Sequence, residues 1–285
     1  MTIAEYVAQG RARIEKATLQ CADPLLHMKQ IVEVALGIDT ATLYVRWGEA
    51  VGPEDLKRLD ALLERRLSGE PFQYICGYEW FWSSRFEVGP GVLIPRRETE
   101  RLVEILLAEE PRASGVKVAE LGAGSGNIGL TVCLERPGWE WHAFEKNPDS
   151  VPYVRRNQKT HLSGRDGYHL HEGDFFAGVG QFAPFDWIAA NPPYVAREYF
   201  PGLSKEVRHE PPLALDGGAR GIECLARIIE ECPAWLRPGG GLCLEIGFDQ
   251  GEWARETMTS RGFKDVRILF DYSGLPRVAL ARGLA

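Results

Sequence analysis

Val116-Lys117-Val118-Ala119-Glu120-Leu121-Gly122-Ala123-Gly124-Ser125-Gly126 joins an apolar run to a loop that contains three glycines. The apolar run is typical of a buried strand, which we place at residues 116–121. The glycines predict a tight turn, and a helix is expected directly after it, from Asn127 to Leu134. A strand, a glycine-rich turn and a helix in this order predict an α/β fold with a ligand site at the turn.

Strands and helices alternate in the remainder of the chain. Further strands are predicted at residues 139–144, 168–171, 185–190 and 241–246, with a helix at residues 221–236 and a closing antiparallel pair at residues 266–270 and 277–281. This alternation is typical of a Rossmann-like, doubly wound and mostly parallel sheet. In such a sheet, ligands bind beyond the carboxyl ends of the strands. The residues that follow each strand are therefore the candidates for a site.

The amino-terminal part has the signals of a helical bundle. Thr2 and Glu5 have the spacing of a capping box, Asp23-Pro24 is a typical helix start, and Gly37 is a typical helix end. Apolar residues recur at helical spacing between these signals, which predicts a small helical domain over residues 1–72. This stretch has nine basic and 11 acidic residues, so it is better suited to a protein partner than to phosphate groups.

Residues 73–97 break the helical period. Residues 73–82 are rich in aromatic and β-branched side chains, and Gly89-Pro90-Gly91 is a turn signal. We therefore predict a short β-hairpin that connects the helical domain to a second domain of residues 98–285.

The glycine loop fits two different cofactors. Gly124, Gly126 and Gly129 have the spacing of the dinucleotide fingerprint, and Glu145 follows about 20 residues later, as an NAD site requires. The earlier frame, Glu120-x-Gly122-x-Gly124-x-Gly126, favours S-adenosylmethionine, because its glycines let the backbone approach the amino-acid and ribose portion. The loop alone leaves both cofactors open.

The side chains that would surround S-adenosylmethionine follow successive predicted strands. Glu145 would accept hydrogen bonds from both ribose hydroxyls, and Glu120 would help to hold the ammonium group, directly or through water. Asp174 and Phe175 fall where the adenine is expected, with a carboxylate for its amine and a ring for stacking. The predicted cofactor site is completed by Gly122, Ala123, Gly124, Ser125, Gly126 and Asn191.

Asn191-Pro192-Pro193-Tyr194 directly follows the predicted strand at residues 185–190. Proline has no N–H, so the carbonyl before it is not easily absorbed into regular structure. The Asn191 side-chain oxygen and a nearby backbone carbonyl can therefore point outward together, beside the flat ring of Tyr194. Two convergent acceptors next to a ring suit a planar –NH2 group, which predicts a site for an amide or an exocyclic amine.

Composition excludes several classes of protein. The 285 residues are 45% hydrophobic and 10% aromatic, as in a globular protein, and the net charge of −7 disfavours a nucleic-acid surface. No apolar run approaches the roughly 20 residues of a membrane span, and the N-terminus lacks the pattern of a signal peptide. The six cysteines are scattered without a CxxC pair. We therefore expect free thiols, no metal centre and a cytoplasmic protein.

Further motifs give the chain a resemblance to one family. They are Gly69-Glu70-Pro71-Phe72-Gln73-Tyr74-Ile75, Leu93-Ile94-Pro95-Arg96 with Thr99-Glu100, Glu210-Pro211-Pro212-Leu213-Ala214-Leu215, and Asp271-Tyr272 with Arg277-Val278. With the glycine loop and the Asn-Pro-Pro-Tyr corner, they make the chain resemble the bacterial protein-(glutamine-N5) methyltransferases of the PrmC/HemK family over nearly its whole length. Glu120 and Glu145 stand where this family often has Asp, and Phe175 stands where some relatives have Trp.

The resemblance implies a class I S-adenosylmethionine-dependent methyltransferase that modifies the glutamine of the Gly-Gly-Gln motif in peptide chain release factors. It assigns catalysis to Asn191, Pro192 and Tyr194, and substrate binding to the whole corner Asn191, Pro192, Pro193 and Tyr194. Asn191 Oδ1 and the Pro192 carbonyl would accept the two amide hydrogens, and Tyr194 would pack on the amide plane. The release factor is then the expected partner of the helical domain, and neither nucleic acid nor a membrane is expected to bind. Two alternatives stay open: an amino-methyltransferase acting on a ribosomal protein or a nucleic acid, and an NAD-dependent oxidoreductase.

Overall fold

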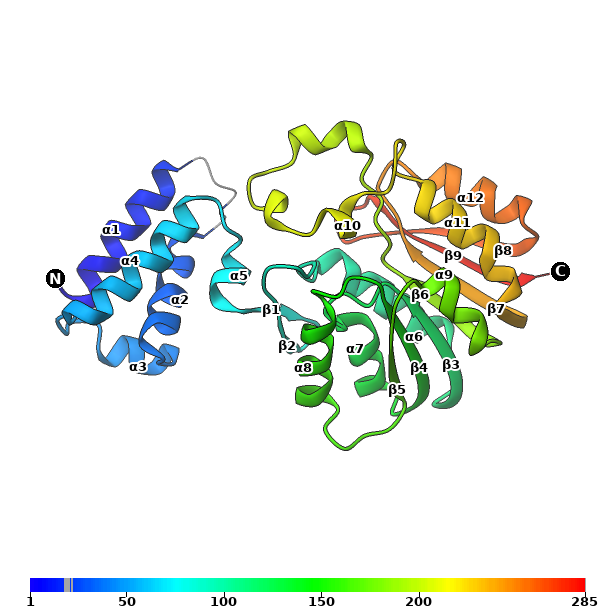
Figure 1. The fold of residues 1–285 in the computed structure, drawn as a ribbon, viewed down its shortest axis with the longest axis horizontal. Helices are drawn as coiled ribbons and strands as arrows, with labels where there is room; N and C mark the ends of the chain where they lie inside the picture. The colour runs from blue at the N-terminus through cyan, green and yellow to red at the C-terminus, as the bar shows by residue number, and fades with distance from the viewer. Residues whose placement is uncertain (18–20, 22, 285) are drawn as a thin grey trace. The chain divides into compact units, whose positions relative to one another are not determined.

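The computed structural model describes residues 1–17, 21 and 23–284, and the chain divides into two compact units (Figure 1). The smaller unit consists of Met1–Tyr78 and Gly202–Glu210, and the larger unit of Glu79–Pro201 and Pro211–Ala285. Within the described part of the chain, no helix is long and apolar enough to cross a membrane. Every residue predicted to bind the cofactor belongs to the larger unit.

The smaller unit is a helical bundle around one apolar core. Its described helices are α1 (Ile3–Lys16), α2 (Pro24–Leu36), α3 (Thr40–Val45), α4 (Pro53–Leu67) and α5 (Phe72–Cys76). The predicted caps are confirmed, because Thr2 and Glu5 exchange the two hydrogen bonds of a capping box and Gly37 ends α2 with a φ of 63°. The apolar residues that recur at helical spacing in the sequence meet in this core.

A buried ion pair joins the segment Gly202–Glu210 to this bundle. The Arg66 side chain is 1% exposed, and its Nη2 lies 3.2 Å from Oε1 of Glu206. Arg66 Nη1 also donates a hydrogen bond to the carbonyl of Glu70. A buried guanidinium needs such partners to offset the loss of its hydration. The pairing explains why a segment more than a hundred residues away in the sequence belongs to the helical unit.

The predicted β-hairpin is present, but its turn lies elsewhere. β1 (Tyr78–Phe81) pairs with β2 (Ser84–Glu87), and Trp82, whose φ is 58°, lies in the turn between them. The sequence pattern predicted the turn at residues 89–91 and extended structure from residue 73, where the chain forms α5 instead. Phe72 and Ile75 are buried in the core of the bundle. Tertiary packing therefore overrode the β propensity of this stretch.

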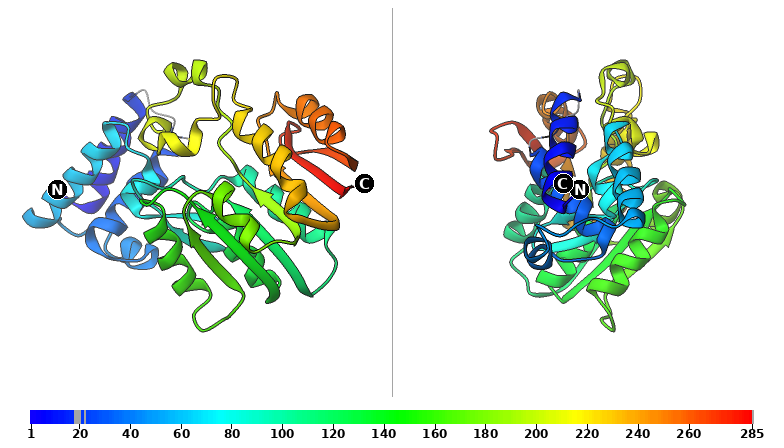
Figure 2. Two further views of the ribbon diagram at one scale, coloured as in Figure 1. Left: turned by 45° about the vertical axis from the view of Figure 1, so that its right-hand side comes forward. Right: turned by 90° about the vertical axis from the view of Figure 1, so that its left-hand side faces the viewer.

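The larger unit is built on a seven-stranded sheet with the strand order β5-β4-β3-β6-β7-β9-β8 (Figure 1). The strands are β3 (Ser114–Leu121), β4 (Gly138–Glu145), β5 (Tyr168–Glu172), β6 (Phe185–Ala190), β7 (Leu236–Glu245), β8 (Phe263–Phe270) and β9 (Pro276–Leu284). Five strands are parallel to one another, in the order β5-β4-β3-β6-β7. β9 pairs antiparallel with β7 and with β8. This antiparallel end, drawn in orange and red in Figure 2, confirms the predicted closing pair.

Helices cover both faces of the sheet, as the alternation of elements predicted. One core contains residues of α6 (Glu100–Glu109), α7 (Asn127–Glu135) and α8 (Val151–His161), and the other contains residues of α9 (Phe175–Gly178), α11 (Glu223–Glu231) and α12 (Gly251–Ser260). The shorter elements are α10 (Pro212–Leu215) and the 3-10 helices η1 (Arg97–Thr99), η2 (Val179–Gln181), η3 (Arg197–Gly202) and η5 (Cys232–Ala234), while the 3-10 helix η4 (Val207–His209) belongs to the smaller unit. Because helices occupy the faces, the carboxyl ends of the strands remain available for a ligand.

The helix predicted at residues 221–236 is shorter than expected. α11 covers Glu223–Glu231, and the chain then passes through η5 into β7, which begins at Leu236 rather than at residue 241. Pro233 lacks the N–H that the interior of an α-helix needs, so the α-helical hydrogen bonding stops in this region. The prediction was therefore wrong about the bounds of this helix and the start of the next strand, but right about the order of the elements.

A buried contact around Glu120 locks β3 and β4 to α7. Glu120 is 0% exposed, and its Oε2 accepts a hydrogen bond of 2.7 Å from Nε1 of Trp141. Gly129 of α7 lies against both groups, since a Cβ at this position would be 2.2 Å from Trp141 Nε1 and 2.5 Å from Glu120 Oε2. The last glycine of the Gly-x-Gly-x-x-Gly pattern thus permits the close approach of helix and strand.

Gly129→Ala is expected to lower the free energy of unfolding by about 1–3 kcal/mol, the usual cost of overpacking a rigid core. Urea denaturation followed by circular dichroism measures this change. Gly178→Ala is the matched control, because its Cβ would approach Phe144 only to an ordinary 3.5 Å. Equal stability of the two variants would contradict the close contact at Gly129.

Candidate active site

The carboxyl ends of the central parallel strands surround a cavity of about 840 Å3, part of which is open to solvent. Its walls include Gly122 and Gly124 after β3, Glu145 at the end of β4, Asp174 and Phe175 after β5, and Asn191 after β6. In α/β proteins, small molecules bind in the crevice at the carboxyl ends of such strands. The structure therefore brings most of the predicted cofactor residues together around one space.

The glycine loop presents bare backbone to this cavity. Gly122 and Gly124 have φ values of 84° and 59°, in the left-handed region that favours glycine. A Cβ at either position would meet no other protein atom within 4 Å. The space beside the loop is therefore open, and a ligand there can touch main-chain atoms directly.

Glu145 is held in a fixed orientation at the cavity wall. Its Oε2 accepts the N–H of Gly124 and its Oε1 accepts the N–H of Asn147, each at 2.6 Å. The residue is 6% exposed, and burial raises the pKa of its carboxyl group. A carboxylate has about four lone-pair positions, and these two bonds use half of them. Both oxygens can therefore still accept hydrogen bonds from two adjacent hydroxyl groups.

Aromatic and charged side chains form another part of the cavity. Asp174 caps α9, and its Oδ1 accepts the N–H of Phe176 at 3.0 Å. The rings of Phe175 and Phe176 lie 4.3 Å apart between centroids, and the guanidinium of Arg227 lies 3.6 Å from the ring centre of Phe176. Phe176 and Arg227 were not predicted. Arg227 comes from α11, and nothing in its local sequence marks it as a cavity residue.

Asn191 lies where three cavities meet. It lines the main cavity and two smaller neighbours, one that includes Thr99 and one that includes Tyr194. Its Nδ2 donates a hydrogen bond of 3.2 Å to Oγ1 of Thr99, a residue that is 1% exposed. This bond engages the amino end of the Asn191 amide. Its Oδ1 remains an acceptor that no described residue engages.

The backbone of the corner formed by residues 191–194 supplies a second hydrogen-bond acceptor. Pro192 and Pro193 line the main cavity, and no N–H in the described ranges donates to the carbonyl of Pro192. Tyr194 lines the neighbouring cavity, and its Oη donates a hydrogen bond of 3.1 Å to Oε1 of the buried Glu245. Burial and the nearby Glu245 carboxylate raise the pKa of Tyr194, so its phenol is neutral at physiological pH.

Two side chains that were not predicted from the sequence hold the Asn191–Tyr194 corner in place. Glu245, at the end of β7, is 1% exposed and accepts the bond from Tyr194. Gln250 Nε2 donates to the carbonyls of Tyr194 and Gly221, each at 3.0 Å. The position of Glu245 at the end of a predicted strand was a signal that could have identified it. Gln250 has no comparable signal in the sequence.

Some predicted cofactor residues lie outside the main cavity. Ala123 and Ser125 line the smaller cavity beside Thr99. Gly126 packs against α7, since its Cβ would be 2.9 Å from Leu130, and Glu120 is fully buried against Trp141. The contact of Glu120 with an ammonium group, directly or through water, stays a prediction.

Comparisons with known proteins agree on one family. The PrmC N-terminal domain matches residues 5–77, and the Methyltransferase small domain matches residues 97–210. The release factor glutamine methyltransferase of Geobacter sulfurreducens is 35% identical over 90% of this chain and 89% of its own length. The chain belongs to the release factor glutamine methyltransferase family. The Escherichia coli member is 38% identical over 85% of this chain and 86% of its own length, so the predicted resemblance is confirmed.

Solved structures confirm the predicted fold class for this family member. A methyltransferase from Pyrococcus furiosus aligns with a TM-score of 0.52 at 20% identity, over 70% of this chain and 89% of its own. The hMettl16 catalytic domain aligns with a TM-score of 0.56 at 13% identity, over 81% and 80%. The shared architecture is the class I methyltransferase fold, with its antiparallel β7-β9-β8 end. A methyltransferase domain favours the methyl-donor frame of the glycine loop over the NAD frame.

The stability of the protein should depend on pH through Glu120. Burial raises the pKa of this carboxyl from 4.5 to about 8, and the nearby Glu145 adds to the shift. Between these two values the folded protein holds a proton that the unfolded chain releases. The free energy of unfolding should therefore fall as the pH rises from 4.5 to about 8, by up to about 1.4 kcal/mol per unit.

Glu120→Gln tests this expectation, because the amide keeps an acceptor for Trp141 but does not ionise. Urea denaturation of both proteins at several pH values across the window gives the two slopes. The variant should lose stability less steeply with rising pH than the unmodified protein. The same slope in both proteins would show that Glu120 does not take up a proton on folding.

Proposed function

We propose that this protein transfers a methyl group from S-adenosylmethionine to the side-chain amide nitrogen (N5) of the glutamine in the Gly-Gly-Gln motif of a peptide chain release factor. Family membership supports the reaction class, because the relatives from Geobacter sulfurreducens and Escherichia coli are release factor glutamine methyltransferases. The observation that carries the proposal is the pair of unengaged acceptors at one corner, Asn191 Oδ1 and the Pro192 carbonyl, beside the glycine-loop cavity.

The residues around the cavity fit S-adenosylmethionine. The open backbone of Gly122 and Gly124 would admit its amino-acid portion, and Glu145 has lone pairs left for the two ribose hydroxyls. Phe175 would lie against the adenine, and Asp174 would accept a hydrogen bond from its amino group. When bound, this cofactor supplies an electrophilic methyl group. The residues of the chain then have to present the substrate nitrogen.

Positioning is the main task because a carboxamide nitrogen is a weak nucleophile. Its lone pair is delocalised into the carbonyl group. Acceptance of both N–H groups by Asn191 Oδ1 and Pro192 O would orient the –NH2 group and increase the electron density on nitrogen. Positive charge develops on that nitrogen as the new bond forms, so the two acceptors bind the transition state more strongly than the ground state. The proton can leave to water after transfer, and no side chain has to remove it beforehand.

The buried groups behind the corner would keep these acceptors in place. Thr99 fixes the amide of Asn191, and Glu245 holds the hydroxyl of Tyr194, whose ring would pack on the amide plane of the substrate. Gln250 holds the backbone of the corner at the Tyr194 carbonyl. Precise placement of a reacting group lowers the activation barrier substantially, because the reactants lose their translational and rotational entropy on binding and not in the chemical step.

The helical domain of residues 1–72 would bind the body of the release factor. Its described surface exposes apolar side chains on two neighbouring helices, Leu26 and Val34 on α2 and Tyr44 and Val45 on α3. Val45 is 85% exposed, and such residues commonly mark protein contacts when they occur together. In this arrangement residues 73–97 connect the partner-binding domain to the catalytic domain of residues 98–285. The six free cysteines agree with a cytoplasmic location.

Asn191→Ala should bind S-adenosylhomocysteine nearly normally but lose methyl transfer by at least about 100-fold, the scale seen when one transition-state acceptor or donor is removed. Single-turnover assays with a radiolabelled methyl donor measure the loss. Thr99→Val is the matched comparison. It removes the hydroxyl that orients Asn191 and that also hydrogen-bonds the buried Glu245, but it leaves Asn191 Oδ1 in place, so it should reduce turnover by a smaller factor. Turnover of Asn191→Ala comparable to that of the unmodified protein would refute the positioning role.

Glu145→Ala should weaken cofactor binding by about 1.5–3 kcal/mol, the typical contribution of hydrogen bonds to a charged group. Isothermal titration with S-adenosylhomocysteine measures the dissociation constant. Glu145→Asp retains the carboxylate and should bind more tightly than the alanine variant. If the alanine variant binds with unchanged affinity, the ribose lies elsewhere. Titration with NAD in the same assay tests the dinucleotide alternative.

The substrate is tested by incubating the protein with a purified bacterial release factor and a labelled methyl donor, followed by peptide mass spectrometry. We expect one added methyl group on the glutamine of the Gly-Gly-Gln motif. A release factor in which that glutamine is replaced by asparagine is the matched control and should remain unmodified. Labelling of ribosomal protein or RNA, with none on the release factor, would instead favour the alternative amino-methyltransferase.

A further inference from the structure

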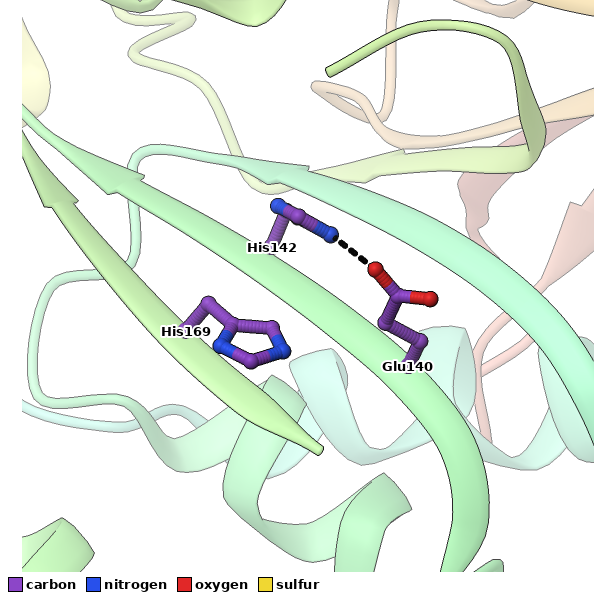
Figure 3. A group of neighbouring side chains, drawn as sticks. All are labelled: Glu140, His142 and His169. Carbon is purple, nitrogen blue, oxygen red and sulfur yellow. Dashed lines mark hydrogen bonds and ion pairs between the residues drawn. The ribbon is translucent and has the colours of Figure 1, made fainter. Parts of the chain in front are cut away.

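Three histidines and a glutamate gather on one face of the edge strand β5 and its neighbour β4, away from the residues proposed to act in catalysis. Glu140 and His142 are two residues apart on β4, so their side chains point to the same face. His142 is paired in register with His169 on β5, and His171 follows on the same face of β5. Figure 3 shows Glu140 and His142 on one strand and His169 on its neighbour.

The side chains in this cluster are already in mutual contact. His142 Nε2 lies 2.7 Å from Oε1 of Glu140, and His142 Nδ1 lies 2.9 Å from Nε2 of His171. One potential ligand atom from each of Glu140, His142 and His169 lies within 4.8 Å of the other two. His169 makes no hydrogen bond to any described residue, so its ring nitrogens are free to take a ligand. The arrangement therefore offers three donors to one small space.

We propose that Glu140, His142 and His169 bind one Zn²⁺ ion, with water in the fourth position. Imidazole nitrogen and carboxylate oxygen are common Zn²⁺ ligands in proteins. Tetrahedral coordination with bonds of about 2.0–2.1 Å requires ligand atoms about 3.4 Å apart. Rotation of Glu140 and His169 can bring the ligand atoms to this spacing from the present one, in which Glu140 Oε1 and His142 Nε2 lie 2.7 Å apart, because the Glu140 side chain is 49% exposed and His169 is also exposed. His142, with a side chain only 6% exposed, would serve as the fixed ligand.

His171 would orient the central ligand from behind. When Nε2 of His142 is bound to the metal, Nδ1 carries the proton and donates it in a hydrogen bond to Nε2 of His171. A second hydrogen bond of this kind is usual for histidine ligands and fixes the orientation of the ring. His171 is itself held by aromatic neighbours, with ring centroids 4.1 Å from Phe182 and 4.7 Å from Phe144. The partner required behind the ligand is therefore already in place.

The charge environment contains features for and against a cation. Burial lowers the pKa of His142 and of His171, which keeps both imidazoles neutral, as metal binding requires. Hydrogen bonding to His142 lowers the pKa of Glu140, which keeps that carboxylate ionised. Lys117 opposes the ion, since its Nζ lies 3.8 Å from Oε1 of Glu140. Removal of the Lys117 charge should therefore tighten binding.

Metal binding would stabilise the sheet and would not take part in catalysis. A shared ion would cross-link the edge strand β5 to β4 next to the point where their pairing begins. β5 leads directly into Asp174 and Phe175, and β4 leads into Glu145. Zn²⁺ would thus stabilise the strands that carry the cofactor-binding residues, without touching the reacting atoms. This inference does not depend on the identity of the methylated substrate.

The test is isothermal titration of the metal-free full-length protein with Zn²⁺, together with Co²⁺ absorption spectroscopy. We expect one bound ion per chain and a tetrahedral Co²⁺ spectrum without a thiolate charge-transfer band. Glu140→Gln and His169→Asn should each weaken Zn²⁺ binding by at least about 10-fold. Both positions are exposed, so both variants should fold, and circular dichroism confirms this. Lys117→Gln, which keeps a hydrogen-bond donor, should bind Zn²⁺ more tightly than the unmodified protein.

The controls separate this cluster from other metal ligands in the chain. Glu172→Gln alters an exposed carboxylate at the end of β5 that pairs with Arg155, and it should bind Zn²⁺ normally. Cys21 Sγ lies 3.1 Å from Nδ1 of His27 and forms the main competing pair. A thiolate band that disappears in Cys21→Ser, absence of Zn²⁺ binding, or unchanged affinity in both Glu140→Gln and His169→Asn would each overturn the proposal.

Discussion

The parallel pairing of β3 with β4 on one side and with β6 on the other is the constraint on which the site depends. In this register Leu121 lies opposite Phe144, and Glu120 lies opposite Ala189. The glycine loop, Glu145 and Asn191 follow within a few residues of these pairs, so three segments far apart in the sequence end at one edge of the sheet. Hydrogen bonds between the strands thus set the distances across the cavity, and the contact of Gly129 with Trp141 keeps α7 close behind.

The chemistry of the site rests on polar groups that are buried beside it. Thr99 orients the amide of Asn191, Glu245 engages the hydroxyl of Tyr194, and Gln250 holds the carbonyl of the same tyrosine. Burial of any of these groups without a hydrogen-bond partner would cost free energy. Breaking one of the hydrogen bonds is therefore unfavourable, and the corner is held rigidly. In the proposed function, this rigidity would hold both hydrogens of the substrate carboxamide in a defined direction.

The two faces of β4 show how one strand can serve separate purposes. Trp141 points to the face of α7 and stabilises Glu120, whereas Glu140 and His142 point to the opposite face. The first face supports the glycine loop that lines the main cavity. The second face carries the histidine cluster proposed to bind Zn²⁺, which would brace the edge of the sheet. Alternation along the strand keeps these two polar groups apart in space.

Local signals in the sequence determined the order of strands and helices, the helix caps at Thr2 and Gly37, and the positions of Glu145 and Asn191 at the ends of strands. These features depend on residues within a few positions of each other, so the chain carries them without its fold. The tertiary structure alone decided that residues 72–76 are helical, because Phe72 and Ile75 are buried in the bundle core. It also decided that Glu120 is buried, that Thr99, Glu245 and Gln250 support the corner, and that His142 meets His169. Contacts between distant segments follow from strand pairing and side-chain packing, and no short pattern in a single sequence specifies them.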